Sequence, residues 1–126
     1  MKTIINTTDA PAPIGPYSQA VLANGFLYVS GQIPINPATG ELTQESIKHE
    51  TEQVMRNLNA VLLEAGFEFS HVLKSTIFLS DMSLFAEVNE VYGSYFTADF
   101  PARETVAVKG LPKGVNVEIS VIAYKG

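Results

Sequence analysis

The chain has 126 residues, of which 46% are hydrophobic and 17% charged, a composition typical of a folded globular domain rather than of a disordered chain. Its formal net charge is −5, and its eight Lys and Arg residues are scattered, which argues against a nucleic-acid partner because such binding needs clustered basic residues. The absence of cysteine excludes disulfides, thiolate catalysis and cysteine-ligated metals, and it fits a reducing compartment, so we expect a cytoplasmic protein.

No apolar run approaches the length of a membrane span, so we expect no contact with a membrane. Residues 1–6 carry a single Lys and lack the long apolar core of a secretory signal. The sequence contains no internal repeat, low-complexity tract or linker, so we expect residues 1–126 to form one domain.

The first forty residues predict short strands separated by turns. Asn24-Gly25 is the preferred pair for a type I′ turn and therefore predicts a β-hairpin. Three prolines interrupt regular structure over residues 9–16, and residues 31–42 are again predicted to be a loop. The predicted strands span residues 2–6, 17–23 and 26–30.

Two amphipathic helices are predicted, over residues 46–65 and 83–96, because apolar residues recur there at helical spacing. Ser46 is suited to cap the first helix, and Gly66 lies where a helix commonly ends. Residues 72–80, between the two helices, predict a strand with apolar side chains on both faces.

Residues 101–123 predict a second β-hairpin, whose two alternating strands are joined by a loop over residues 110–114. On the first strand Arg103 and Thr105 share a face. On the second, Glu118 points away from a stripe of Val and Ile residues. The loop allows two registers, which place Glu118 opposite either residue 106 or residue 105. In both, Arg103 and Glu118 lie close together on adjacent strands.

The order of these elements predicts an α+β fold, in which a single mixed β-sheet carries two helices on one face. Two helices cover only that face. The strands still carry apolar residues on the other, which would be a large exposed patch in a monomer. We therefore expect the chain to associate with copies of itself.

Arg103 and Glu118 are the pair of greatest chemical interest. An Arg offers a planar fork suited to a carboxylate, and a Glu between β-branched residues must face solvent, a partner or a ligand. A cross-strand salt bridge is the simpler interpretation from spacing alone. Tyr17, Gly31 and Asn89 likewise have simple interpretations as a strand-start aromatic, a turn glycine and a helix-edge amide.

Metal and nucleophile chemistry find little support in the sequence. His49 is predicted to be solvated on the polar face of the first helix, and His71 to pack or cap at the start of a strand. Neither lies with carboxylates at metal-ligand spacing, so no metal site is expected. The sequence also lacks a Gly-x-Ser-x-Gly elbow and a phosphate-binding glycine loop.

Four separated motifs resemble, in order and nearly end to end, those of the reactive intermediate deaminase A family, also called RidA or YjgF-like. They are IGPYSQA at 14–20, SGQIP at 30–34, FAEVNEVY at 85–92, and the stretch 101–123 with its Pro-Ala-Arg start and Val-Glu-Ile strand.

The resemblance implies a chorismate-mutase-like (RidA-like) fold and a homotrimer, with the sheets forming a central barrel and the sites in the clefts between subunits. It implies that Arg103 holds the substrate carboxylate and that Glu118 positions or activates the attacking water. Thr105 departs from the family, since many relatives carry Cys there, and this excludes a thiol nucleophile but not water activation. The residues implied to line the pocket are Tyr17, Gly31, Ile33, Asn89, Arg103 and Thr105.

The implied reaction is hydrolysis of short 2-imino acids, such as 2-iminopropanoate and 2-iminobutanoate, to 2-keto acids and ammonia without a cofactor. Their enamine tautomers are released by pyridoxal-phosphate-dependent dehydratases. Two other functions stay open. A noncatalytic regulator that binds small anions would not need Glu118, and a ribonuclease or translation inhibitor is disfavoured by the acidic charge balance.

Overall fold

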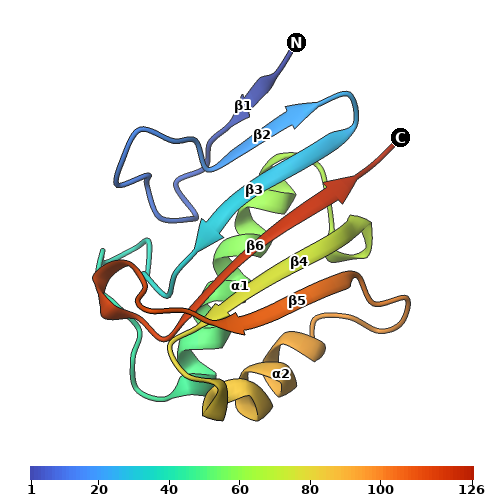
Figure 1. Cartoon of the computed structure of the whole chain (residues 1–126). Coiled ribbons are helices and arrows are strands. Elements are labelled where there is room, and N and C mark those ends of the chain that lie inside the picture. Colours follow the sequence, from blue (N-terminus) through green and yellow to red (C-terminus); the bar gives the residue numbers. More distant parts are fainter.

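The computed structural model describes residues 1–126 and contains one mixed β-sheet with two α-helices packed on one face (Figure 1). The strands are β1 Thr3–Ile5, β2 Ala20–Ala23, β3 Phe26–Gln32, β4 Val72–Leu79, β5 Ala102–Ala107 and β6 Val117–Tyr124, and the helices are α1 Ile47–Glu64 and α2 Phe85–Gly93. The strand order is β1-β2-β3-β6-β4-β5, in which only β4 and β5 are parallel. The predicted fold class is confirmed.

Local signals predicted the first hairpin and the first helix correctly. Asn24 and Gly25 have φ angles of 54° and 85°, the left-handed pair that a type I′ turn between β2 and β3 requires. Ser46 caps α1 by accepting a hydrogen bond from the His49 backbone N–H at 3.1 Å. Gly66, with a φ of 81°, follows the end of that helix.

The second helix is shorter than predicted at both ends. Asp81 accepts a hydrogen bond from the Ser83 backbone N–H at 2.8 Å, which opens a 3-10 turn over Met82–Leu84 before α2 begins. Beyond its end, the Phe96 N–H bonds to the Gly93 carbonyl three residues back, so residues after 93 continue only in tight turns. Neither α1 nor α2 combines the length and the hydropathy that a helix crossing a membrane would need.

The predicted hairpin over residues 101–123 is wrong. β5 pairs in parallel with β4, and β6 lies between β3 and β4, so β4 separates the two strands expected to be neighbours (Figure 1). Phe78 of β4 pairs with Val106 on one side and with Glu118 on the other. The physical reason is the connection, because the segment from residue 108 to residue 116 is long enough to carry the chain past the end of β4.

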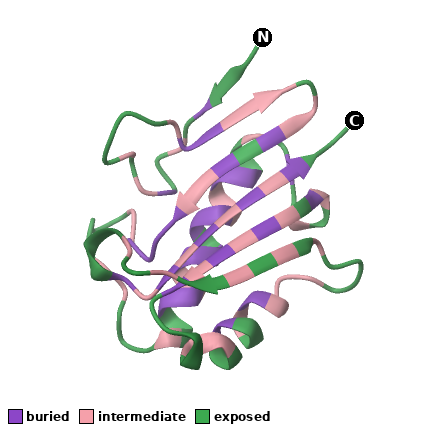
Figure 2. Ribbon diagram, in the orientation of Figure 1, coloured by how far each residue is buried: buried purple, intermediate pink, exposed green.

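The helix-covered face of the sheet holds the core. Along β6 buried and half-buried residues alternate, as predicted, with Val117, Ile119 and Val121 in the core and Glu118 on the other side (Figure 2). The largest fully buried side chains of α1 are Val54, Met55, Leu58, Val61 and Leu62.

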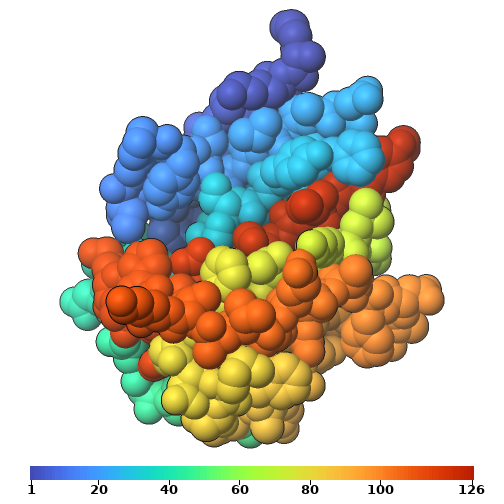
Figure 3. All heavy atoms as spheres, in the orientation of Figure 1, coloured from blue at the N-terminus to red at the C-terminus, as the bar shows by residue number.

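The other face of the sheet carries exposed apolar side chains, as the sequence predicted. Figure 3 views the molecule from this side, with α1 largely behind the sheet and α2 beside the β5 edge. Ile4, Tyr28, Val106 and Tyr124 come from four different strands, and each is between 42% and 50% exposed. A surface of this kind commonly meets another protein.

Candidate active site

Glu118 lines a cavity of about 320 Å³. Four separate segments supply its walls: the irregular loop before β2, the end of β3 with the first residue after it, the 3-10 turn Pro112–Gly114 and strand β6. Three of the residues implied by the family resemblance, Tyr17, Gly31 and Ile33, line this cavity together with Glu118. The other lining residues, Ile14, Ser30 and Pro112, were not predicted from the sequence.

Gly31 of β3 lies directly beside the Glu118 side chain. The ladder between β3 and β6 shifts register between Val29 and Gln32, so Gly31 lies in a bulge. A Cβ atom at Gly31 would lie 2.8 Å from Cδ and 3.0 Å from Cγ of Glu118. Only glycine leaves the Glu118 carboxylate its place above the backbone.

Glu118 has no cation beside it in the chain. None of the three salt bridges involves Glu118, and burial raises the pKa of its carboxyl above the ordinary value. The expectation that Arg103 lies near Glu118 is therefore wrong for a single chain. A half-buried carboxylate without a fixed partner is able to accept a proton from a water molecule in the cavity.

Tyr17 forms the exposed edge of this cavity. Its side chain is 48% exposed, and its hydroxyl accepts a hydrogen bond from the Ile14 backbone N–H at 3.2 Å. The bond ties the ring to the loop that precedes β2, so the hydroxyl has a defined position.

Arg103 lines a second cavity, of about 360 Å³, at the β5 edge of the sheet. Its Nη1 donates to Asn89 Oδ1 at 2.5 Å, and its guanidinium lies 5.5 Å from the ring centroid of Phe85 and 5.2 Å from that of Tyr92. The Tyr92 hydroxyl in turn donates to the buried Ser75 hydroxyl at 2.8 Å. Arg103 is thus held by three side chains of α2 and faces the helix side of the sheet.

Phe85, Asn89 and Tyr92 were only partly recognised from sequence. They stand at positions i, i+4 and i+7 of one helix, which places them on one face. The amphipathic pattern of residues 83–96 predicted the helix, and Asn89 was named both as a helix-edge amide and, through the family resemblance, as a pocket residue. This spacing, which places an amide between two aromatic rings on one face of the helix, is the sequence feature that could have indicated a binding site for a cationic side chain.

Thr105 lies two residues beyond Arg103 on β5 and so shares its face. Its hydroxyl oxygen is the one buried side-chain oxygen or nitrogen of the chain without a hydrogen-bond partner. Buried polar atoms are almost always paired. This hydroxyl is therefore available to a ligand or to another chain.

Arg103 and Glu118 belong to different halves of the molecule. They are separated by β4, and Glu118 points to the open face while Arg103 contacts α2. One chain therefore brings together Tyr17, Gly31, Ile33 and Glu118 in one cavity, and Arg103 with Asn89 in another. Neither cavity alone contains both a cation that can bind a substrate carboxylate and a carboxylate that can act as a base.

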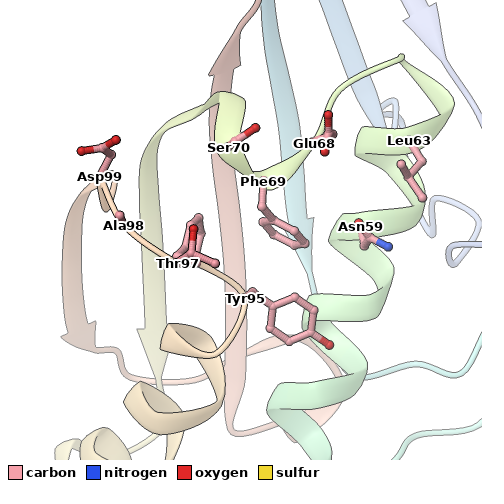
Figure 4. A pocket seen from close by; sticks show the side chains of 10 residues that line it. Asn59, Leu63, Glu68, Phe69, Ser70, Tyr95, Thr97, Ala98 and Asp99 are labelled. Carbon is pink, nitrogen blue, oxygen red and sulfur yellow. The ribbon is translucent and has the colours of Figure 1, made fainter.

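The largest cavity of the chain, about 520 Å³, lies elsewhere, between α1 and the segments around residues 68–70 and 95–99 (Figure 4). Its ionisable residues are Glu68, Asp99 and Tyr95, so it has no cation to hold an anionic ligand. The Tyr95 hydroxyl points toward α1 and donates to Glu52, and burial together with this bond raises the pKa of Tyr95 to about 12. The cavity therefore contains carboxylates but no cation that could hold the carboxylate of an anionic substrate.

The chain is similar over nearly its whole length to known proteins. The family model described as Endoribonuclease L-PSP matches residues 7–125. A RutC family protein from Pyrococcus horikoshii is 52% identical over 125 residues, which cover 99% of each chain. The 2-iminobutanoate/2-iminopropanoate deaminase of Bos taurus is 45% identical over 126 residues, which cover 100% of this chain and 92% of that one.

The solved structures agree. A Rid family protein from Yersinia pestis, whose function is described as unknown, superposes with a TM-score of 0.96 at 51% identity, covering 99% of this chain and 100% of the other. Relatives at comparable identity thus carry different names, and these names alone do not decide the activity. The family is shown by the whole-chain match and by the shared fold: this chain belongs to the RidA/YjgF family, whose family model is described as Endoribonuclease L-PSP.

Proposed function

We propose that this chain hydrolyses short 2-imino acids to 2-keto acids and ammonia. The observation that carries the proposal is the Glu118 carboxylate, which lies in a cavity beside Gly31 with no cation to occupy it. The name of the bovine relative, a 2-iminobutanoate/2-iminopropanoate deaminase, supports the same reaction. The substrates proposed are 2-iminopropanoate, 2-iminobutanoate and their enamine tautomers.

The chemistry needs one base and no cofactor. Glu118 accepts a proton from a water molecule while the water oxygen forms a bond to the imine carbon. The imine nitrogen, protonated, receives the electron pair of the C=N bond. Glu118 then returns the proton to the amine nitrogen. As the C–N bond breaks and the carbonyl forms, Glu118 takes the proton of the carbinol hydroxyl and passes it to the departing ammonia, so the products are the 2-keto acid and ammonium, and Glu118 is ionised again. Positioned acid–base help of this kind contributes about 10²- to 10⁴-fold.

Arg103 supplies the affinity for a small 2-imino acid. Its guanidinium has a planar fork that can pair with both oxygens of the substrate carboxylate. Asn89, Phe85 and Tyr92 hold it in one orientation. A fixed cation that binds the non-reacting end of the substrate also orients the imine carbon toward the base.

The complete site is proposed to form between neighbouring copies of the chain in a homotrimer. Within one chain Arg103 and Glu118 lie on opposite sides of β4 and face different ways. Strand β5, which carries Arg103, has one unpaired edge, and the open face of the sheet is apolar. A neighbour packed on this face is therefore expected to bring its Arg103 cavity beside the Glu118 cavity of the first chain.

The other functions named for the family find less support in these residues. Arg103 is the one cationic residue that lines either cavity, whereas an RNA backbone needs several basic groups. A noncatalytic anion binder would use Arg103 but leaves the half-buried carboxylate of Glu118 without a purpose. Imine hydrolysis uses both residues.

The test is a coupled assay in which a dehydratase generates the imine and the purified chain is added. We expect the chain to accelerate imine decay well above the spontaneous rate. Binding of 2-ketobutanoate without any acceleration would instead identify a noncatalytic anion-binding protein and would refute the enzymatic proposal.

Arg103→Lys is expected to lower kcat/KM by about 10²-fold although the charge is kept, because an ammonium cannot reproduce the planar fork. Arg56→Lys is the matched control, since Arg56 forms an exposed ion pair with Glu52 on α1 and lines neither cavity. Near-parental turnover by Arg103→Lys would mean that the substrate carboxylate is held elsewhere.

Mixing two inactive variants tests whether the site is shared between copies. Arg103→Lys keeps Glu118, and Glu118→Gln keeps Arg103, so a mixed assembly contains some sites with both parental residues. Random assortment predicts recovery of about a quarter of the parental activity after the two are refolded together. Native mass spectrometry gives the oligomeric state, and either a monomer at micromolar concentration or no recovery would contradict the shared site.

A further inference from the structure

The buried face of α1 carries two polar side chains that leave the helix to bind loops. Glu50 is 3% exposed and Asn57 is 1% exposed, although most of the other buried residues of this helix are apolar. Placing polar groups in a core costs free energy unless every one is hydrogen-bonded. Their hydrogen-bond partners therefore show which segments of the chain these two side chains hold in place.

Asn57 fixes the loop that follows β3. Its Nδ2 donates to the carbonyl of Ile33 at 3.1 Å and to the carbonyl of Ile35 at 3.0 Å, and its Oδ1 accepts from Gln53 at 3.0 Å. Both amide protons are used on one loop, two residues apart. Ile33, the first of the two, lines the cavity around Glu118.

Glu50 fixes the segment that leads into β6. Its Oε1 accepts from the backbone N–H of Asn116 at 3.1 Å, and its Oε2 accepts from the Asn116 side-chain amide at 2.8 Å. None of the chain's salt bridges includes Glu50, so this buried carboxylate depends on Asn116. Asn116 stands two residues before Glu118, and its Oδ1 also accepts from the Ser80 hydroxyl at 2.7 Å.

The two loops meet beneath the cavity. Ile33, Ile35 and Val115 form a small hydrophobic cluster separate from the main core. Ile33 belongs to the loop held by Asn57, and Val115 adjoins the residue held by Glu50. Helix α1 thus holds both the loop after β3, which follows Gly31, and the segment before β6, which precedes Glu118.

We propose that Asn57 and Glu50 are positioning residues of the active site, which set the distance between the Ile33 wall of the cavity and the Glu118 strand. The inference rests on the proposed function, because it deepens the role of the same cavity. Neither residue touches the cavity, so both act through the backbone segments that they hold. Small displacements of a catalytic group have large effects on rate, and supporting side chains of this kind maintain its geometry.

Asn57→Leu tests the first contact, with Val61→Ala as a matched control. Val61 lies one turn further along α1 and is fully buried in the main core, so its truncation also destabilises the fold but leaves both loops held. We expect Asn57→Leu to lower kcat/KM, and the affinity for 2-ketobutanoate measured by calorimetry, each by about tenfold at a temperature where both variants are folded. Val61→Ala is expected to keep both values near those of the parent.

Glu50→Leu and Glu50→Gln test the second contact as a pair. Gln keeps an acceptor for the Asn116 N–H, so Glu50→Gln is expected to recover much of the activity that Glu50→Leu loses. Amide hydrogen exchange gives a readout independent of catalysis: exchange should rise at residues 33–35 in Asn57→Leu and at residues 115–118 in Glu50→Leu, and not there in Val61→Ala.

Equal loss of activity in Asn57→Leu and Val61→Ala, or full retention in both, would overturn the positioning role. A parent chain that binds 2-ketobutanoate but does not hydrolyse imine would refute the proposed reaction instead. In that case the affinity ratios and the exchange pattern still decide the role of Asn57 and Glu50.

Discussion

Replacing Glu118 by Gln is expected to remove imine hydrolysis above the spontaneous rate while the fold is retained. Gln is nearly isosteric with Glu but cannot accept a proton from water, so the loss should be about 10²- to 10⁴-fold in kcat/KM. Arg103 is unchanged, so the affinity for a 2-keto acid should stay close to the parental value. Imine hydrolysis at the parental rate would show that Glu118 is not the base.

The pH dependence follows from the environment of Glu118. Burial raises the pKa of its carboxyl, and the active form is the ionised one. Activity should therefore be sustained at neutral pH and fall on the acid side, starting at a higher pH than an ordinary Glu would give. The acid limb of kcat/KM reports this group in the free enzyme, and it should be absent from the residual rate of Glu118→Gln.

The same shift predicts that Glu118→Gln melts at a higher temperature than the parent at neutral pH. The folded-state pKa lies above the unfolded one, so between these two values the native state binds more protons than the unfolded state. The unfolding free energy then falls as the pH rises through this window. Above the window, the whole cost of burying the ionised Glu118 carboxylate lowers the unfolding free energy. Gln carries no such penalty, so the difference in Tm should vanish below the unfolded pKa of Glu.

In the ligand-free assembly, Arg103 of a neighbouring copy is not expected to lower the pKa of Glu118 and so to reverse the expected change in Tm. Asn89, Phe85 and Tyr92 already hold its guanidinium.

Glu104→Gln is the matched control. Lys74, 2.5 Å away, lowers the pKa of Glu104, so removing that charge should not stabilise the fold. A gain of about 1 kcal/mol raises Tm by about 3–5 °C for a chain of this size. A lower Tm for Glu118→Gln at neutral pH would contradict the desolvated environment.

Elements that local sequence determines were predicted well. Asn24-Gly25 sets the hairpin between β2 and β3 because few other residue pairs adopt two successive positive φ angles. Ser46 and Gly66 delimit α1 through hydrogen bonds and dihedral angles within a few residues. These signals need no knowledge of the rest of the fold.

Pairing between distant strands was not predictable in the same way. The alternation along β5 and β6 was identified correctly, but alternation specifies faces, not partners. β4 carries apolar side chains on both faces and lies between them. The expected contact between Arg103 and Glu118 depended on the hairpin, and it failed with the hairpin.

For the candidate site, too, individual residues were predicted from the sequence, but their arrangement in space was not. The resemblance identified Tyr17, Gly31, Ile33 and Glu118, and these residues line one cavity. It could not show that Arg103 lies in another cavity of the same chain. Supporting residues such as Asn57 were missed because an amide on a helix becomes informative only when the loop that it binds is known.

Gly31→Ala is expected to reduce activity as severely as loss of Glu118, because the new methyl group would occupy the space of the carboxylate. The added Cβ would lie 2.8 Å from Cδ of Glu118, closer than nonbonded carbons approach. The φ angle of Gly31 is not in the left-handed region, so Ala imposes no backbone strain there. The group that must move is the end of a flexible side chain, so the fold should survive while Glu118 leaves its position.

A displacement of about 1 Å can cost about 10²-fold in rate, so kcat/KM of Gly31→Ala should fall by at least that factor while its Tm stays close to that of the parent. Gly110→Ala is the matched control, since a Cβ at Gly110 meets nothing within 4 Å and its φ angle is also not positive. The double variant Gly31→Ala/Glu118→Gln should lose no more activity than Glu118→Gln alone, because both changes remove the same carboxylate from the same place. Additive losses in this cycle, or parental turnover by Gly31→Ala, would mean that Gly31 does not act by making room for Glu118.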